Sequence, residues 1–99
     1  MPFEIHPGER PGVYVLEGEL DAVTVARLDD TVDRTVDGQL ILDIERLTFI
    51  DSTGLRALIR IALERPEDHP VVLRHPSASA ERVLQVAVPD GVPGLEIDT

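Results

Sequence analysis

Two neighbouring hydroxyl residues, Ser52 and Thr53, lie in the run Asp51–Leu55 and are the residues of this chain best placed to do chemistry. An apolar strand predicted over residues 40–44 leads into the run, and an amphipathic helix predicted over residues 52–65 follows it. The spacing therefore puts Ser52 at the first position or the cap of a helix, on a short exposed loop. A hydroxyl there either caps free N–H groups of the first turn or carries a phosphate, because those groups and the helix dipole favour negative charge.

A catalytic serine is the alternative at Ser52, since a serine hydrolase activates its nucleophile with a base that is usually histidine. The nucleophile-elbow pattern needs glycine two residues before the serine, and Ile50 stands there instead. The three histidines, His6, His69 and His75, are scattered, and none is expected beside a strand end next to Ser52. We therefore keep a small serine hydrolase as a remote alternative and predict no metal site from the histidines.

Three aspartates, Asp21, Asp43 and Asp51, each end or follow a predicted strand, so they can approach one edge of a sheet. Clustered carboxylates can bind a divalent cation. Asp21 and Asp51 also directly precede predicted helices, where a carboxylate caps free N–H groups. We predict capping by these two residues, and for Asp43 only a satisfied polar group at a strand end.

The composition indicates a small globular module, a single domain over residues 1–99. The chain has no cysteine, which excludes disulfides and thiolate metal sites, and no lysine, which excludes a P-loop or a Schiff-base enzyme. A formal net charge of −10 argues against nucleic acid or an anionic membrane as the direct partner and is compatible with a basic protein. No apolar run reaches the ~18 residues of a membrane span and no signal-peptide pattern is present, so we expect a cytoplasmic protein. Nothing in the sequence calls for a cofactor.

Strand and helix patterns alternate along the chain, which predicts an α/β fold with a mixed β-sheet packed with α-helices. The apolar run at residues 40–44 predicts a strand buried on both faces. Asp21 is expected to cap a first helix that extends to about Val36. The other predicted elements are strands at residues 3–6, 13–20, 71–73 and 95–97 and a third helix capped by Ser77.

The run Phe49–Leu55 resembles the phosphorylation-site signature of the STAS family, and in particular that of the bacterial anti-sigma factor antagonists. Three further segments agree with this family in order and spacing. Glu17–Asp21 with Leu28 resembles the strand-to-first-helix turn, Leu40–Ile44 the central strand, and Arg82–Val86 the last helix. The resemblance covers nearly the whole chain and implies a STAS-like single domain that is not an enzyme.

The resemblance also implies a switch in bacterial transcription regulation. The partner it implies is an anti-sigma factor that is a serine kinase. The unphosphorylated antagonist binds this kinase and frees a sigma factor; the kinase then phosphorylates Ser52 and the complex dissociates, until a serine phosphatase resets the cycle. Residues matching Asp21 and Asp51 lie near the phosphoacceptor and the partner surface. The alternative within the fold is a STAS subunit or scaffold that regulates another machine, such as a lipid-transporting ATPase, without a phosphorylation cycle.

The expected partner surface also includes three residues that follow Ser52, namely Thr53, Gly54 and Arg56. Thr53 is expected to support the first helical turn, not to accept the phosphate. Glycine costs about 1 kcal/mol against alanine inside a helix, so we expect the facing loop or the partner to pass close to Gly54. Gly54→Ala should then leave the fold at least as stable and weaken binding. Arg56 stands where the family commonly has glycine; it lies with Arg60 on an expected solvated face and can pair with a phosphate on Ser52.

Overall fold

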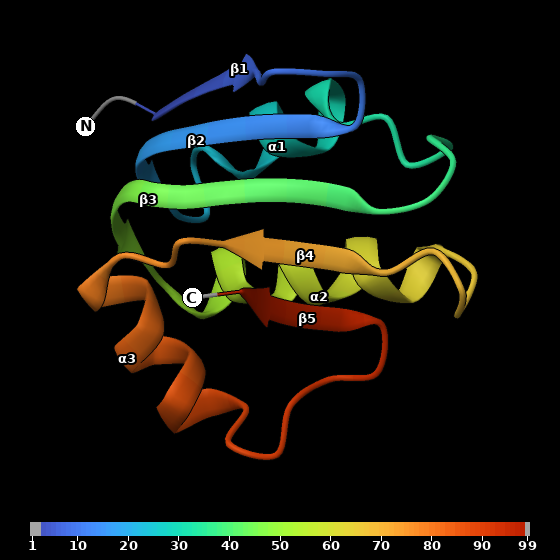
Figure 1. Ribbon diagram of the computed structural model, residues 1–99. Coiled ribbons are helices and arrows are strands. Elements are labelled where there is room, and N and C mark those ends of the chain that lie inside the picture. Colours follow the sequence, from blue (N-terminus) through green and yellow to red (C-terminus); the bar gives the residue numbers. More distant parts are fainter. Residues whose placement is uncertain (1–2, 99) are drawn as a thin grey trace.

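The computed structural model describes residues 3–98 and builds them around one five-stranded β-sheet (Figure 1). Across the sheet the strand order is β1-β2-β3-β4-β5. Strand β1 is antiparallel to β2 and the other neighbouring pairs are parallel, so the sheet is mixed, as predicted. In chain order the elements are β1 (Phe3–Pro7), β2 (Val13–Leu20), α1 (Val25–Thr31), β3 (Leu40–Ile50), α2 (Ser52–Glu64), β4 (Val71–Arg74), α3 (Ala78–Ala87) and β5 (Leu95–Asp98).

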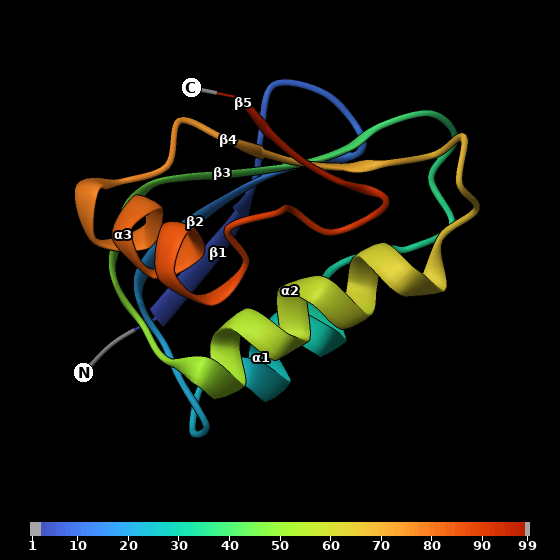
Figure 2. The same cartoon turned by 90° about the horizontal axis from the view of Figure 1, so that it is seen from below.

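A helix joins each parallel pair of strands, because parallel neighbours need a crossover connection. Helix α1 links β2 to β3, α2 links β3 to β4, and α3 links β4 to β5. All three helices lie on the same face of the sheet (Figure 2). The longest of them, α2, has 13 residues, and no helix within residues 3–98 is long and apolar enough to cross a membrane.

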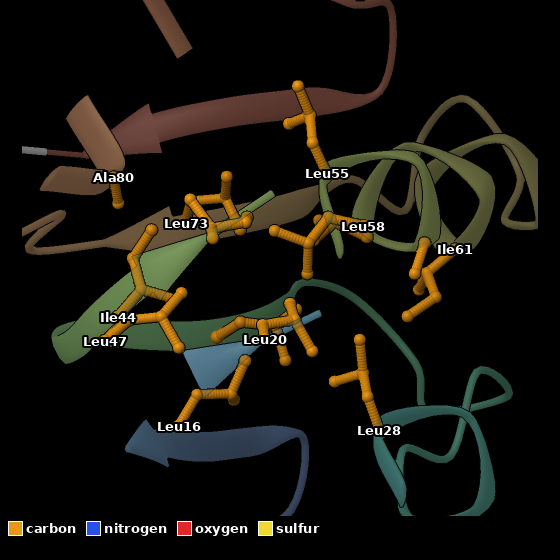
Figure 3. Close-up of a cluster of buried hydrophobic side chains, with 14 of the residues drawn as sticks. Leu16, Leu20, Leu28, Ile44, Leu47, Leu55, Leu58, Ile61, Leu73 and Ala80 are labelled. Atoms are coloured by element: carbon orange, nitrogen blue, oxygen red, sulfur yellow. The ribbon is translucent and has the colours of Figure 1, made fainter. Parts of the chain in front are cut away.

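The main hydrophobic core fills the space between these helices and the sheet. Successive strand side chains point to opposite faces, so alternate residues such as Leu40, Leu42 and Ile44 enter the core, where they are fully buried. Strand and helix side chains meet there (Figure 3), among them Leu16, Leu20, Ile44 and Leu47 from the sheet and Leu28, Leu55, Leu58 and Ile61 from the helices. Each such side chain stabilises the fold by about 1.5–3 kcal/mol. Core side chains therefore anchor both β3 and α2, the two elements that meet near Ser52.

The opposite face of the sheet holds a second, much smaller apolar cluster. Val13, Ile41 and Val72 are buried against one another there. Strand β3 is thus buried on both faces around Ile41, as predicted, although helices cover only one of them.

Asp43 lies inside strand β3, not at a strand end as predicted. On the face without helices its Oδ2 accepts a hydrogen bond from Arg74 Nε at 3.1 Å, while Arg74 Nη1 donates to Glu9 at 2.8 Å. The hydrogen bond from Arg74 lowers the pKa of Glu9 to about 2. Asp43 therefore belongs to an ion pair that joins β3 to β4. It lies seven residues before Ile50, the C-terminal end of its strand.

Helix α1 is much shorter than the sequence predicted, because it ends at Thr31 and the next residue, Val32, has an extended backbone. The N-cap is Thr24, not Asp21. The Arg34 guanidinium folds back on the helix end and donates to the carbonyls of Asp29 and Val32 at 3.0 and 3.1 Å. In a longer helix those carbonyls would accept hydrogen bonds from backbone N–H groups. The Arg34 guanidinium replaces these donors, which allows the helix to end at Thr31.

Arg65 holds the loop that follows α1. It is only 6% exposed although it carries a charge. Its guanidinium donates to the carbonyls of Arg34, Val36, Gly38 and His69, with distances of 2.7 Å to Arg34, 3.1 Å to Val36 and 2.9 Å to His69. Burial lowers the pKa of Arg65, and the nearby Asp33 carboxylate opposes that effect. One side chain at the end of α2 thus fixes two loops at once.

Strand β3 is longer than predicted, since it runs on to Ile50 instead of stopping at Ile44. Leu47 and Ile50 are buried in this extension, whereas Phe49 is exposed. The register with β2 shifts twice along the pair, which interrupts the regular alternation of faces. The first half of the serine motif is therefore strand, not loop.

Candidate phosphorylation site

A single residue, Asp51, separates strand β3 from helix α2. It caps the helix: its Oδ1 accepts a hydrogen bond from the Gly54 N–H and its carbonyl accepts one from the Leu55 N–H, both at 2.9 Å. Ser52 is the first helical residue, as predicted, and its side chain is exposed. Within residues 3–98 the Ser52 hydroxyl makes no hydrogen bond. Asp51 therefore does the capping, and the serine hydroxyl is left facing solvent.

The turn after β2 lies directly beside this junction. The Asp51 N–H donates to the Leu20 carbonyl at 3.2 Å, and Leu20 pairs with Ile50 in the sheet. Asp21 follows Leu20 as Asp51 follows Ile50, at the carboxyl ends of two neighbouring parallel strands. The structure thus brings Asp21 and Asp51 to the same edge of the sheet, as predicted, while Asp43 is elsewhere.

Asp21 shapes its own turn and does not cap α1 as the sequence predicted. Its Oδ1 accepts hydrogen bonds from the N–H groups of Thr24 and Val23, each at 3.0 Å. The Thr24 hydroxyl in turn donates to the carbonyl of Glu19 at 2.7 Å. The hydrogen bonds from Thr24 and Val23 hold the pKa of Asp21 below its ordinary value. The turn therefore keeps a negative charge beside the serine.

Gly54 is where helix α2 touches strand β2. It is buried, and a Cβ built on it would lie 2.5 Å from the Leu20 carbonyl oxygen and 2.9 Å from Leu20 Cγ. The close neighbour anticipated from the sequence is thus the facing strand end. This contact argues against the expectation that Gly54→Ala leaves the fold at least as stable, because the added methyl group would meet the Leu20 backbone. Because Gly54 has no side chain, the start of α2 can lie close to Leu20 and to the turn over residues 21–24 (the Asp21 turn).

The remaining two predicted residues lie on the outer side of the first turns of α2. Thr53 is partly buried, and Arg56 is exposed. Arg60, one turn further on, is not a free solvated cation as expected, since its Nη2 donates to Asp29 Oδ2 of α1 at 2.7 Å. Within residues 3–98, Arg56 makes no hydrogen bond or ion pair.

The sequence and the fold agree with one family. The family model of the STAS domain matches residues 3–88, which is most of the chain. The chain belongs to the STAS domain family. A search of curated proteins finds no match. Among solved structures, the fold is similar to that of the anti-sigma factor antagonist SpoIIAA in its unphosphorylated form. The TM-score is 0.65 and the identity 22%, over 99% of this chain and 89% of that one.

Two exposed apolar side chains lie on the elements that lead to Asp21 and Ser52 in this STAS domain, and the sequence pattern predicted no role for them. Val23, in the Asp21 turn, is 86% exposed, and Phe49, near the end of β3, is 47% exposed. Phe49 of β3 pairs with Glu19 of β2, and β2 is the strand that leads to Asp21. The signal available in the sequence was weak: an apolar residue inside a polar turn, and an aromatic residue two positions before the capping aspartate.

The histidines of the STAS domain lie away from Ser52. His6 contacts Glu17 at 3.0 Å, His69 contacts Asp68 at 3.1 Å, and His75 contacts Asp43 at 3.5 Å. No histidine in the described part of the chain hydrogen-bonds to Ser52, so the histidine–serine pair of a serine hydrolase is not present among these residues. Among residues 3–98, no group of three or more His, Cys, Asp or Glu side chains is arranged to hold a metal ion. The chemistry that this edge offers is that of an accessible acceptor hydroxyl.

Proposed function

We propose that this STAS domain is a bacterial anti-sigma factor antagonist whose phosphoacceptor is Ser52. The observation that carries the proposal is the exposed hydroxyl at the start of α2, beside a capping aspartate, in a fold similar to that of an antagonist. In the unphosphorylated state the domain binds a serine-kinase anti-sigma factor in the cytoplasm and thereby releases the sigma factor. The domain performs no catalysis.

The kinase supplies the chemistry. It transfers the γ-phosphoryl group of ATP to Ser52 Oγ, so that an O–P bond forms at the serine while the bond from the γ-phosphorus to the β–γ bridging oxygen breaks. ADP leaves, and the hydroxyl proton passes to a base of the kinase. Because the Ser52 side chain is exposed and already free of the capping role, no part of the helix start has to open for this reaction. A serine phosphatase reverses the modification by hydrolysis.

The proposed partner surface is the edge formed by the Asp21 turn and the start of α2. Its exposed apolar side chains, Val23 and Phe49, suit a protein partner, since aromatic and apolar anchors dominate binding energy in protein interfaces. Asp21 and Asp51 add negative charge, and Thr53 adds contact area. A basic partner surface is the natural complement of these carboxylates and of the net charge of −10.

Phosphorylation would end binding through charge. A phosphate adds about −1.5 to −2 charge at pH 7. The helix start tolerates this charge, because the N–H groups of the first turn face it. A partner surface shaped to receive a neutral hydroxyl beside Asp21 and Asp51 does not, since the added charge must be desolvated on binding and is repelled wherever acidic groups of the partner lie near Ser52. The switch therefore acts on the interface and leaves the fold intact.

The test is to incubate the purified chain with ATP and each serine-kinase anti-sigma factor of the same genome. Intact mass should show one added phosphate, and peptide mapping should locate it on Ser52. The matched variants are Ser52→Ala, which should stay unmodified, and Thr53→Ala, which should still accept one phosphate on Ser52. Phosphate on Thr53 would overturn the site assignment. No phosphate with any such kinase would favour a STAS module that regulates its partner without a phosphorylation cycle.

A further inference from the structure

We propose that Arg56 is a built-in counter-ion for the phosphate on Ser52. This inference rests on the proposed function and concerns how the modified state is held. Of the two roles that the sequence leaves open for Arg56, a solvated surface residue or a phosphate partner, it selects the second.

The spacing of Ser52 and Arg56 puts both side chains on one face of α2. Residues four apart on a helix are neighbours, and each Cα–Cβ bond tilts toward the helix N-terminus. The Cα–Cβ bond of Arg56 therefore tilts toward the turn that contains Ser52. A negative group placed four residues before a positive one is also the more favourable order of the two along a helix. The arginine needs no change of helix geometry to reach a phosphate at residue 52.

Arg56 also has no competing acid among its helical neighbours. The residues three and four positions away on α2 are Ser52, Thr53, Ile59 and Arg60, and none is acidic. Arg60 is already engaged by Asp29 across the α1–α2 contact, at 2.7 Å.

The other arginine at the α1–α2 contact is engaged in the same way. Arg34 contacts Asp29 at 2.6 Å and Glu64 at 2.8 Å. Arg56 thus differs from both Arg34 and Arg60 in having no ionic partner within residues 3–98, and its side chain is exposed. A phosphate on Ser52 would be its nearest anionic partner on the helix.

The pairing has a consequence for the switch. Free phosphoserine loses its second proton with a pKa near 6. Asp21 and Asp51, at the same edge, would raise that pKa, since like charges disfavour the dianion. An arginine beside the phosphate acts in the opposite direction and keeps it doubly charged at neutral pH. Arg56 would therefore sharpen the contrast between the neutral hydroxyl and the modified state that the partner must distinguish.

The experiment uses the full chain with phosphoserine incorporated at position 52 during synthesis, so that no kinase is needed. Phosphorus NMR follows the second phosphate pKa in the wild-type background, in Arg56→Gln, in Arg56→Lys and in the matched control Arg60→Gln. An exposed i, i+4 ion pair corresponds to a pKa lowered by about 0.3. We expect the wild-type phosphate pKa to be lower than that of Arg56→Gln by at least this amount, with Arg56→Lys in between and Arg60→Gln unchanged.

Equal phosphate pKa values in the wild type and Arg56→Gln would overturn the inference, as would an equal change in the Arg60→Gln control. Arg56 is exposed and has no hydrogen bond or ion pair within residues 3–98, and thermal melts of each variant check that the fold is unchanged. The failure of a kinase to modify Ser52 would instead count against the proposed function, because the NMR comparison does not depend on the kinase.

Discussion

At the scale of single residues, Gly54 sets how closely α2 approaches the end of β2. Gly54→Ala should gain about 1 kcal/mol of helix propensity and lose about 1–3 kcal/mol to overpacking, because its Cβ would lie 2.5 Å from the Leu20 carbonyl oxygen. We expect the loss to dominate, with a net decrease of about 1 kcal/mol in the free energy of unfolding. Urea unfolding measures it.

The matched control for this variant is Thr53→Ala, which alters the same helical turn without adding an atom near Leu20. It should change stability by less than about 0.5 kcal/mol. A Gly54→Ala variant as stable as the wild type would show that the strand end shifts freely, and that the contact with Leu20 does not constrain the site.

The cap and the serine could be predicted because their geometry is local. Asp51, Ser52 and the helix that follows depend on residues only a few positions apart. A glycine in the first helical turn also indicated a close neighbour at Gly54. The sequence did not identify this neighbour as Leu20, which lies 34 positions earlier in the chain. Asp21 was assigned to a helix cap because a carboxylate before a helical pattern usually caps it, and nothing local indicated that Thr24 would take that place.

At the scale of the elements, Arg65 joins the end of α2 to the loops after α1 and before β4. Arg65→Met keeps most of the apolar stem and removes the guanidinium, leaving the carbonyls of Arg34, Val36, Gly38 and His69 without that donor. We expect a loss of about 3 kcal/mol in the free energy of unfolding, because hydrogen bonds to charged groups are strong and the site is nearly closed to solvent. Denaturant titration measures the loss.

Arg60→Met is the control at this scale, since Arg60 forms an exposed ion pair with Asp29. It should cost less than about 1 kcal/mol. Equal effects of Arg60→Met and Arg65→Met would mean that the four carbonyls are satisfied by water and that Arg65 does not hold the loops together.

The elements that the sequence predicted well are those whose apolar pattern decides them. Strand β2, helix α2 and the Ser77 cap of α3 follow from local periodicity and turn chemistry. Helix α1 was predicted too long because Val32 and Val36 continue the helical spacing, while its end depends on arginines that contact the loop from within it and from α2. The Arg65 contact joins residues 29 positions apart, so it leaves no trace in a local pattern.

At the scale of the whole molecule, the ion pairs on the face of the sheet without helices make stability depend on pH. The pKa of Glu9 is about 2 in the folded state, below its ordinary value of 4.5, because Arg74 donates to its carboxylate. The unfolded chain therefore binds more protons between these values. The stabilisation from Glu9 is fully present above pH 4.5 and is lost as the pH falls toward 2.

The measurement is the urea midpoint at pH 6, 4 and 3 for the wild type and for Glu9→Gln. The wild-type midpoint should fall more steeply below pH 4.5 than that of the variant. Glu67→Gln, which removes an exposed carboxylate from the loop after α2, controls for the change in net charge and should follow the wild type. Parallel curves for the wild type and Glu9→Gln would mean that Arg74 does not hold Glu9 in solution.

The domain as a whole is proposed to be a binding surface that a single phosphate switches. The expected charge on Ser52 lies beside Asp21 and Asp51, at an edge of the molecule whose fold does not depend on the serine hydroxyl. A variant that adds charge at this position should therefore change binding and leave the melting temperature within a few degrees of the wild type.

The most direct test is calorimetry of the kinase partner with Ser52→Asp, Ser52→Ala and the unmodified wild type, with thermal melts alongside. Ser52→Ala should bind like the wild type. Ser52→Asp carries part of the charge of a phosphate and should bind at least tenfold more weakly, a difference of about 1.4 kcal/mol. Equal affinities of the folded Ser52→Asp and Ser52→Ala variants for the partner would contradict the claim that charge at Ser52 is the switch.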